Sequence, residues 1–269
     1  MDRLRRISSR QNALVKELRR AFERGELTPE GDCAIESVRT LEEGIRSGLR
    51  FRAAFFRESA LGRAERLLPQ ISSHADALLL PDEVFQSAVA TENSQGVAAL
   101  VRIKQFKLDD ALRAPEPLLV VAVGVRDPGN LGTLIRSAEA FGASGVLLGD
   151  DTVSPFNAKV VRASAGSLFR LPVVRLGNSK LVDALRQHGL KLLATSSHKG
   201  TPIDEAQLTG GLALVIGNEG AGVPKELMRQ VDGLIAIPHA ANVESLNAGI
   251  AASIVLYEAS RQRRAGLAK

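Results

Sequence analysis

The sequence is poor in cysteine and in long apolar runs. Its 269 residues include a single cysteine, Cys33, which cannot form a disulfide within the chain. No apolar run approaches the roughly 20 residues that a membrane-crossing helix needs, and the basic N-terminus is not followed by the apolar core of a secretory signal. These absences argue against a disulfide-rich secreted protein and against a membrane protein, and we expect a protein of the reducing cytoplasm with no membrane partner.

Aromatic residues and several catalytic patterns are also missing. Aromatic residues make up 4% of the chain and include no tryptophan, which argues against a site that stacks bases on an aromatic platform. The four histidines lack the spacing of metal ligands, so we expect no metal. The GxSxG turn of a serine hydrolase is absent, as are the phosphate-binding patterns GxGxxG and GxxxxGK. A Rossmann-type nucleotide enzyme is therefore disfavoured, although stabilisation by NAD would revive it.

Positive charge is concentrated at the N-terminus. The net charge of the whole chain is +5, and residues 1–24 alone carry +5 from eight basic and three acidic side chains. Apolar residues of this segment recur at helical intervals, with a break near Ser8 and Ser9. The basic face of such a helix can bind an anionic polymer. Alternatively, it is only the solvated face of a helix that packs on the next domain.

Two blocks of alternating strand and helix patterns follow. Apolar runs alternate with helical patterns from Cys33 to about Ile103, which predicts a small α/β sandwich. Residues 104–117 are polar and contain two prolines, as in a linker or the start of a new unit. Beyond them, five apolar strands alternate with helices, which predicts an α/β domain with a mostly parallel sheet covered by helices on both faces. The strands are expected at residues 118–123, 145–148, 191–195, 212–216 and 234–237.

These patterns divide the chain into four predicted parts. They are a basic helical segment over residues 1–29, the small α/β domain over 30–103, a linker over 104–117 and the larger α/β domain over 118–269. The most informative residues lie in the last part, where three stretches marked by glycine or asparagine each follow an expected strand. Because parallel strands end at one edge of a sheet, we expect a ligand site at that edge.

The first marked stretch, DPGNLGTLIRSAEAFG, begins at Asp127. Proline and glycine end the preceding strand, and Asn130 is suited to cap a helix whose apolar face runs from Leu131 to Phe141. Arg136 lies off that face. An arginine near a helix start gains nothing from the helix dipole, so its position indicates a phosphate or carboxylate partner. A surface ion pair with Glu139 is the alternative.

The second stretch, LALVIGNEGAGVP, passes from a strand into a loop of residues 217–224. Three glycines within six positions allow a ligand to approach the backbone closely and expose amide groups. Glu219 would repel a phosphate, whereas it suits a cationic ligand or a hydroxyl. Pro224 fits the first turn of the next helix. A tight structural turn with an exposed glutamate is the alternative.

The third stretch, IAIPHAANVESLNAGIAASIVLYE, begins at Ile235. Asn242 is the expected cap of its helix, which would place Ser245 and Asn247 in the first turn, where unsatisfied amides and small polar groups converge. The expected apolar face of the helix consists of Leu246, Ile250, Ile254 and Tyr257.

The order and spacing of these three stretches resemble the signature motifs of the SpoU (TrmH) family of RNA ribose 2'-O-methyltransferases, within the SPOUT superfamily. The resemblance covers about residues 118–261 and includes the intervening KVVRASAGSLFRLPV from Lys159. Residues 30–103 resemble the substrate-binding domain of the family's ribosomal RNA members, with TENSQGVAALV near their end. The entry AIES departs from that pattern, because Ser37 stands where a glycine usually follows the glutamate.

The resemblance implies functional residues in all three stretches and a fold with a deep trefoil knot. The implied catalytic residues are Asn130, Arg136, Glu219, Ser245 and Asn247. S-adenosylmethionine would be held in a bent form, largely by backbone, with contacts expected from Thr195, Gly217, Asn218, Gly220, Ile237 and Leu246. We expect RNA to contact Arg5, Arg6, Arg10, Lys16 and Arg162. The family usually forms homodimers through helices that include the C-terminal one.

We therefore predict an S-adenosylmethionine-dependent enzyme that methylates a ribose 2'-hydroxyl in structured RNA. Ribosomal RNA, most of all 23S, is favoured because of the N-terminal domain. A transfer RNA methyltransferase and a catalytically silent RNA-binding protein are the alternatives. Arginine stays protonated in proteins, so Arg136 is expected to bind an RNA phosphate and stabilise the developing alkoxide, not to act as a base. Without an aromatic platform, RNA contacts should be mainly to phosphates and shape.

Overall fold

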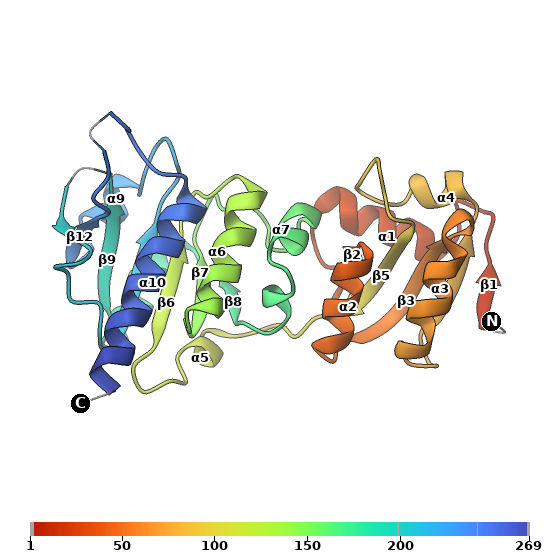
Figure 1. The fold of residues 1–269 in the computed structure, drawn as a ribbon, viewed down its shortest axis with the longest axis horizontal. Helices are drawn as coiled ribbons and strands as arrows, with labels where there is room; N and C mark the ends of the chain where they lie inside the picture. Colours follow the sequence, from red (N-terminus) through yellow and green to blue (C-terminus); the bar gives the residue numbers. More distant parts are fainter. Residues whose placement is uncertain (1–2, 198, 241, 268–269) are drawn as a thin grey trace. The chain divides into compact units, whose positions relative to one another are not determined.

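The computed structural model describes residues 3–197, 199–240 and 242–267. Contacts divide the chain into two compact units, each built around its own sheet (Figure 1). Unit 1 comprises Met1–Gln105 and Ser154–Arg170, and unit 2 comprises Phe106–Val153 and Leu171–Lys269. None of the helices in the described ranges is long and apolar enough to cross a membrane.

Unit 1 contains a five-stranded mixed sheet in the order β1-β4-β3-β5-β2. β1, β4 and β3 are parallel, whereas β5 is antiparallel to both of its neighbours. The strands are β1 (Leu4–Arg6), β2 (Asp32–Glu36), β3 (Arg50–Arg57), β4 (Asp76–Leu80) and β5 (Val97–Arg102). The small α/β fold is confirmed, but the helical expectation for Leu4 and its neighbours is wrong. These residues form an edge strand because their backbone pairs with Ala77–Leu79 of β4.

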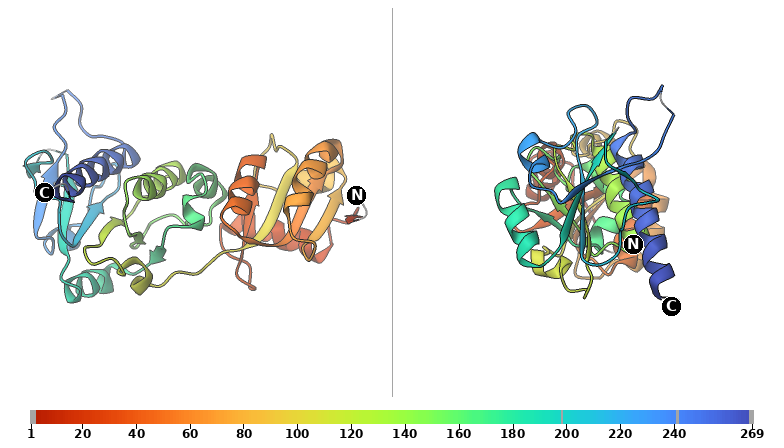
Figure 2. Two further views of the ribbon diagram at one scale, coloured as in Figure 1. Left: turned by 60° about the horizontal axis from the view of Figure 1, so that its bottom comes forward. Right: turned by 90° about the vertical axis from the view of Figure 1, so that its left-hand side faces the viewer.

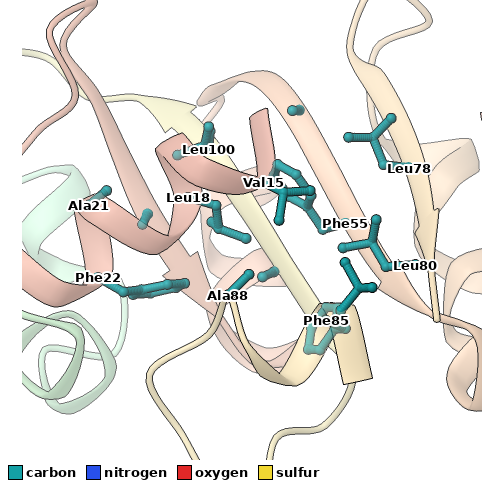
Figure 3. Close-up of a cluster of buried hydrophobic side chains, with 14 of the residues drawn as sticks. Val15, Leu18, Ala21, Phe22, Phe55, Leu78, Leu80, Phe85, Ala88 and Leu100 are labelled. Carbon is teal, nitrogen blue, oxygen red and sulfur yellow. The ribbon is translucent and has the colours of Figure 1, made fainter. Parts of the chain in front are cut away.

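Helices cover this sheet, and α1 supplies much of one core. The helices are α1 (Ala13–Arg24), α2 (Val38–Arg46), α3 (Leu61–Leu67), α4 (Asp82–Gln86) and α7 (Ala158–Ala163), with short 3-10 turns at η1 (Glu58–Ala60), η2 (Leu68–Gln70) and η3 (Ser167–Phe169). The side chain of Asn12 caps α1, and Gly25 in the left-handed conformation ends it. Val15 and Leu18, three positions apart, face the sheet beside Phe55 (Figure 3).

Unit 2 contains a seven-stranded sheet in the order β10-β12-β9-β11-β6-β7-β8, and every neighbouring pair is parallel. The strands are β6 (Leu118–Ala122), β7 (Gly145–Leu148), β8 (Val173–Arg175), β9 (Lys191–Ser196), β10 (Thr201–Pro202), β11 (Leu212–Ile216) and β12 (Gly233–Ala236). The five expected strands and the parallel sheet are confirmed. β8 and β10 were not predicted, because two or three residues carry too little pattern.

Helices lie on both faces of this sheet (Figure 2). They are α5 (Leu108–Ala111), α6 (Pro128–Ala140), α8 (Asn178–Gln187), α9 (Lys225–Met228) and α10 (Ala248–Leu267). α6 and α10 pack together on one face, and α5, α8 and α9 contribute to the core on the other. α5 lies within residues 104–117 and buries Ala111 completely. The functional domain limits and the trefoil knot stay predictions.

Candidate functional site

The three marked stretches come together at one edge of the sheet of unit 2. β12, β9 and β11 are adjacent and parallel, so their carboxyl ends lie side by side. A cavity of about 320 Å³ opens at these ends. Its lining comes from the ends of β9 and β11, from Ile237 after β12, and from the start of α10. The cavity therefore lies at the edge where the strand pattern predicts a ligand.

Most of the predicted site residues line this cavity. All six expected cofactor contacts do so, namely Thr195, Gly217, Asn218, Gly220, Ile237 and Leu246. Of the five expected catalytic residues, Glu219 and Ser245 also line it. Asn130 hydrogen-bonds to Glu219, and Asn247 hydrogen-bonds to Asn130. Arg136 neither lines the cavity nor belongs to this hydrogen-bonded chain. The roles of these residues stay predictions.

Asn218 organises the loop after β11. Its Oδ1 accepts hydrogen bonds from the backbone N–H groups of Gly220 and Ala221, each at 2.9 Å. Its Nδ2 donates to the carbonyl oxygen of Gly124 at 3.0 Å. The backbones of Asn218 and Gly222 exchange hydrogen bonds of 3.1 and 2.9 Å. The loop is thus held by its own asparagine, which sequence reasoning assigned only to cofactor contact.

The glycines of this loop have different reasons for being glycine. A Cβ on Gly217 would lie 2.3 Å from the carbonyl carbon of Gly222 and 2.4 Å from the nitrogen of Val223, so the turn leaves no room for a side chain. Gly222 has a φ of +68°, which L-residues rarely adopt. By contrast, a Cβ on Gly220 would meet only Asn218 Oδ1, at 3.6 Å. The structural-turn alternative therefore explains Gly217 and Gly222 but not Gly220, which lines the cavity and has room for a Cβ.

A chain of hydrogen bonds joins one polar side chain from each marked stretch. Asn130 Nδ2 donates to the Oε1 of Glu219. Asn247 Nδ2 donates to Asn130 Oδ1 at 2.8 Å, and Asn247 Oδ1 accepts from the backbone N–H of Ile250 at 3.2 Å. Each amide therefore has a defined orientation, because its oxygen and its nitrogen both have partners.

Two helix caps differ from the predictions. Asp127, not Asn130, caps α6, and its Oδ1 accepts from the backbone N–H of Asn130 at 2.9 Å. The side chain of Asn130 is thereby available for Glu219. Similarly, α10 begins at Ala248 and its first turn is capped by Asn247 instead of Asn242. Ser245 consequently precedes the helix instead of lying in its first turn.

Arg136 lies on the exposed side of α6, off the buried face of that helix, as the spacing predicts. Within the described part of the chain, no residue hydrogen-bonds to its guanidinium or forms an ion pair with it, so the alternative pair with Glu139 is not observed. Its charge is available to a partner outside the chain.

The basic residues expected to bind RNA differ in how they are paired. Arg5 lies 3.7 Å from Asp76, Arg6 lies 2.6 Å from Glu58, and Arg10 lies 3.6 Å from Glu83. Arg162 faces Glu36 at 3.9 Å. Lys16, on α1, lines a hollow together with Arg20 and Arg24, and none of these three has a partner among the described side chains. Arg20 and Arg24 belong to the eight basic residues counted in this segment but were not among the five expected RNA contacts, although they follow Lys16 at four-residue intervals.

Sequence reasoning also missed part of the cavity lining. Ser196 and Ser197 continue from Thr195 at the end of β9, and the rule that ligands bind at strand ends could have found them. His239 lines the cavity too, with Nδ1 2.7 Å from the carbonyl oxygen of Ile237 and Nε2 3.1 Å from that of Val243. The sequence carries no signal for these two contacts of the His239 ring, because they depend on how the loop folds. The described residues contain no cluster of three His, Cys, Asp or Glu side chains that could hold a metal.

Comparison with known proteins supports the same interpretation. The model of the SpoU rRNA Methylase family matches residues 117–257. The 23S rRNA (guanosine(2553)-2'-O)-methyltransferase RlmP of Bacillus subtilis (strain 168) is 34% identical over 254 residues, which cover 94% of this chain and 98% of that protein. The AdoMet-bound rRNA methyltransferase from Sinorhizobium meliloti has a TM-score of 0.81 at 28% identity, over 97% of this chain and 98% of the other. SpoU methyltransferase AviRb from Streptomyces viridochromogenes, in complex with AdoMet, also has a TM-score of 0.81 at 28% identity, over 94% and 98%. The chain therefore belongs to the SpoU rRNA methylase family.

Proposed function

We propose that this protein transfers a methyl group from S-adenosylmethionine to a ribose 2'-hydroxyl of ribosomal RNA, with 23S rRNA favoured. The observation that carries the proposal is the hydrogen-bonded chain Glu219–Asn130–Asn247, which starts at the cavity and joins all three motifs. Similarity over nearly the whole chain to enzymes named as rRNA methyltransferases supports ribosomal over transfer RNA. Such a substrate also supports a cytoplasmic location.

The cavity fits S-adenosylmethionine in size and chemistry. Its volume of about 320 Å³ is in the range of small-molecule sites. The glycine-rich loop lines the cavity, and although the N–H groups of Asn218, Gly220, Ala221 and Gly222 are hydrogen-bonded within the loop, the carboxylate of Glu219 complements a cationic ligand. We assign the cofactor to the six lining residues Thr195, Gly217, Asn218, Gly220, Ile237 and Leu246. When bound, it supplies an electrophilic methyl group on a positively charged sulfur.

The polar residues of this chain would position the ribose. Glu219 fixes the amide of Asn130, and Asn130 in turn fixes Asn247, so these groups need no reorganisation when RNA binds. Ser245 adds a hydroxyl in the cavity lining. Orientation of this kind can contribute about 7 kcal/mol or more to the acceleration. Arg136 would hold the RNA phosphate and stabilise charge developing on the 2'-oxygen, since its guanidinium stays protonated.

An exposed apolar face supports a homodimer. Among the described residues, the large hydrophobic side chains that are exposed are Val243, Ile250 and Tyr257, and the last two are 50% and 51% exposed. Ile250 and Tyr257 belong to the apolar face that the sequence pattern predicts for this helix, whereas the residues that α10 buries include Ala252, Val255, Leu256 and Ala259. A second copy covering this face would explain its composition. Ile250→Asp combined with Tyr257→Asp should shift the sedimentation coefficient of a dimer to that of a monomer, and an unchanged coefficient would exclude this interface.

Calorimetric titration tests the proposal at its first step. We expect saturable binding of S-adenosylmethionine by the wild-type protein, together with incorporation of its labelled methyl group into ribosomal RNA. Absence of cofactor binding would favour a silent RNA-binding protein. Incorporation into transfer RNA but not into ribosomal RNA would favour the other alternative.

A further inference from the structure

Glu36, at the end of β2, is a buried carboxylate that the proposed mechanism does not use. Its side chain is 2% exposed, and neither carboxylate oxygen has a hydrogen-bond partner. Burying an ionised group without hydrogen bonds is costly, and native structures contain few such groups. The cation that faces it is Arg162, whose Nη1 lies 3.9 Å from Oε2, beyond hydrogen-bond distance. Stability alone does not account for this arrangement.

Arg162 is held through one nitrogen of its guanidinium, while its side chain stays partly exposed. It lies on α7, in the segment Ser154–Arg170 that packs in unit 1. Its Nη1 is buried without a hydrogen bond, yet the side chain as a whole is 36% exposed. Arg170 of the same segment repeats the pattern, with Nη1 3.5 Å from Glu43 Oε2 and 2.9 Å from Ser47 Oγ. Acidic side chains of unit 1 thus hold both arginines of this segment.

The backbone directly after Glu36 is also unusual. Ser37 has φ 89° and ψ 148°, a region that residues other than glycine rarely occupy. Its backbone N–H donates to the carbonyl oxygen of Val97 at 3.3 Å, and its Oγ accepts from the N–H of Thr40 at 3.3 Å. This strained residue therefore fixes the point at which β2 ends, and with it the backbone of Glu36. Backbone strain of this kind concentrates at functional sites.

We propose that Glu36 is a positioning residue, which holds the Nη1 of Arg162 so that the other N–H groups of its guanidinium contact a phosphate of the RNA. A charge fixed in this way loses less conformational freedom on binding than a mobile surface arginine. The inference rests on the proposed function only in taking RNA as the partner. From the sequence, we expect only that Arg162 contacts RNA. The proposal adds that a buried acid, Glu36, is needed for this contact with a polyanion.

Glu36→Gln tests the proposal, because it keeps the shape of the side chain and removes its charge. General electrostatics predicts that losing a negative charge strengthens binding to RNA. Positioning predicts the opposite, with affinity for ribosomal RNA about tenfold weaker and the salt dependence reduced by about one phosphate contact. The melting temperature should fall, because Glu36→Gln leaves the buried Nη1 of Arg162 without its counter-charge, so RNA affinities are compared at a temperature where both proteins are folded. Glu42→Gln is the matched control, because Glu42 on α2 pairs with Arg66 and not with α7; its affinity should equal or exceed that of the wild type.

Three further variants complete the test. Arg162→Ala should weaken RNA binding as much as Glu36→Gln, and the double variant should be no weaker than either one, because both changes remove the same contact. Glu36→Asp keeps the charge but withdraws it by one methylene, and should weaken binding even if Glu36→Gln fails to fold. Wild-type affinity of Glu36→Asp or Glu36→Gln would overturn the positioning role. Wild-type affinity of Arg162→Ala would overturn the phosphate contact.

The readouts separate this inference from the proposed function. In the methylation assay, Glu36→Gln should raise KM for RNA and leave kcat and S-adenosylmethionine affinity unchanged. A lowered kcat at saturating RNA would contradict a role confined to binding. If the wild-type protein neither binds S-adenosylmethionine nor methylates RNA, the proposed function fails, whereas the RNA affinities of these variants still decide the role of Glu36.

Discussion

The cavity edge of unit 2 and the basic surface of unit 1 differ in how much the linear sequence says about them. At the cavity, parallel strands end side by side, so polar residues that follow different strands must meet, and Asn130, Glu219 and Asn247 do. On unit 1, basic residues clustered in sequence are dispersed among acidic partners, as Arg6 is with Glu58. The comparison teaches that topology gathers groups predictably, whereas the availability of a charge depends on distant residues.

The largest expected effect concerns Arg136, the one proposed catalytic residue outside the hydrogen-bonded chain and the cavity lining. Arg136→Ala should lower kcat for methyl transfer by about 10²- to 10³-fold, because a charge that stabilises the developing alkoxide is removed. Affinity for S-adenosylmethionine should stay unchanged. Arg136→Lys keeps the positive charge but loses the paired N–H donors of the guanidinium, so it should retain part of the rate. Turnover of Arg136→Ala at the wild-type rate would remove this residue from the mechanism.

The next effect tests the loop that supports the cavity. In Gly217→Ala the new Cβ collides with backbone of Gly222, so the loop must move. We expect calorimetry to show that affinity for S-adenosylmethionine falls by about tenfold or more, because the displaced loop no longer contacts the cofactor in the same geometry. Gly211→Ala is the control, because its Cβ would have no neighbour closer than 3.7 Å. Equal cofactor affinity of both variants would separate the loop from the cofactor site.

A smaller effect should distinguish available from paired cations on unit 1. Lys16→Ala should weaken RNA binding several-fold and reduce the salt slope by about one, as expected for the loss of one phosphate contact. Arg6→Ala should have the smaller effect, because Glu58 already compensates this charge. Filter binding at several salt concentrations measures both. If Arg6→Ala weakened binding more than Lys16→Ala, the pairing in the structure would not decide which cations contact RNA.

The smallest effect is on stability. Ser37→Gly should raise the free energy of unfolding by about 1 kcal/mol, because glycine adopts a φ of 89° without strain and a glycine cap costs only a few tenths. Ser47→Gly provides a control of opposite sign, since φ at Ser47 is an ordinary −79° and its Oγ accepts from Arg170. Urea denaturation measures both changes. A destabilising Ser37→Gly would mean that the backbone at this residue is not strained.

The sequence predicted the parallel sheet of unit 2 because its strands are continuous apolar runs with recognisable ends. It did not predict β8 and β10, which owe their strand geometry to pairing with β7 and β12. The start of α6 illustrates a second limit. Pro128 in the first turn favours Asp127 as the cap, which a local pattern can reveal, whereas the partner of Asn130, Glu219, lies 89 residues away and is brought there only by the fold.

The predictions for the site also succeeded where local pattern decides and failed where distant residues decide. All six expected cofactor contacts line one cavity because each lies at or just after the end of a strand or just before α10. The expected RNA contacts depended on charge alone, and the sequence could not reveal that Asp76, Glu58 and Glu83 lie beside three of them. The buried position of Glu36 facing Arg162 was likewise invisible, because the two residues are brought together only by the packing of α7 on β2.

The most direct test is the chemical identity of the product. Purified protein would be incubated with S-adenosylmethionine and unmodified 23S rRNA, and the RNA digested to nucleosides for mass spectrometry. The account predicts a single new 2'-O-methylated nucleoside, which is lost in Arg136→Ala at unchanged cofactor affinity. A methyl group on a base, or no transfer despite cofactor binding, would contradict it.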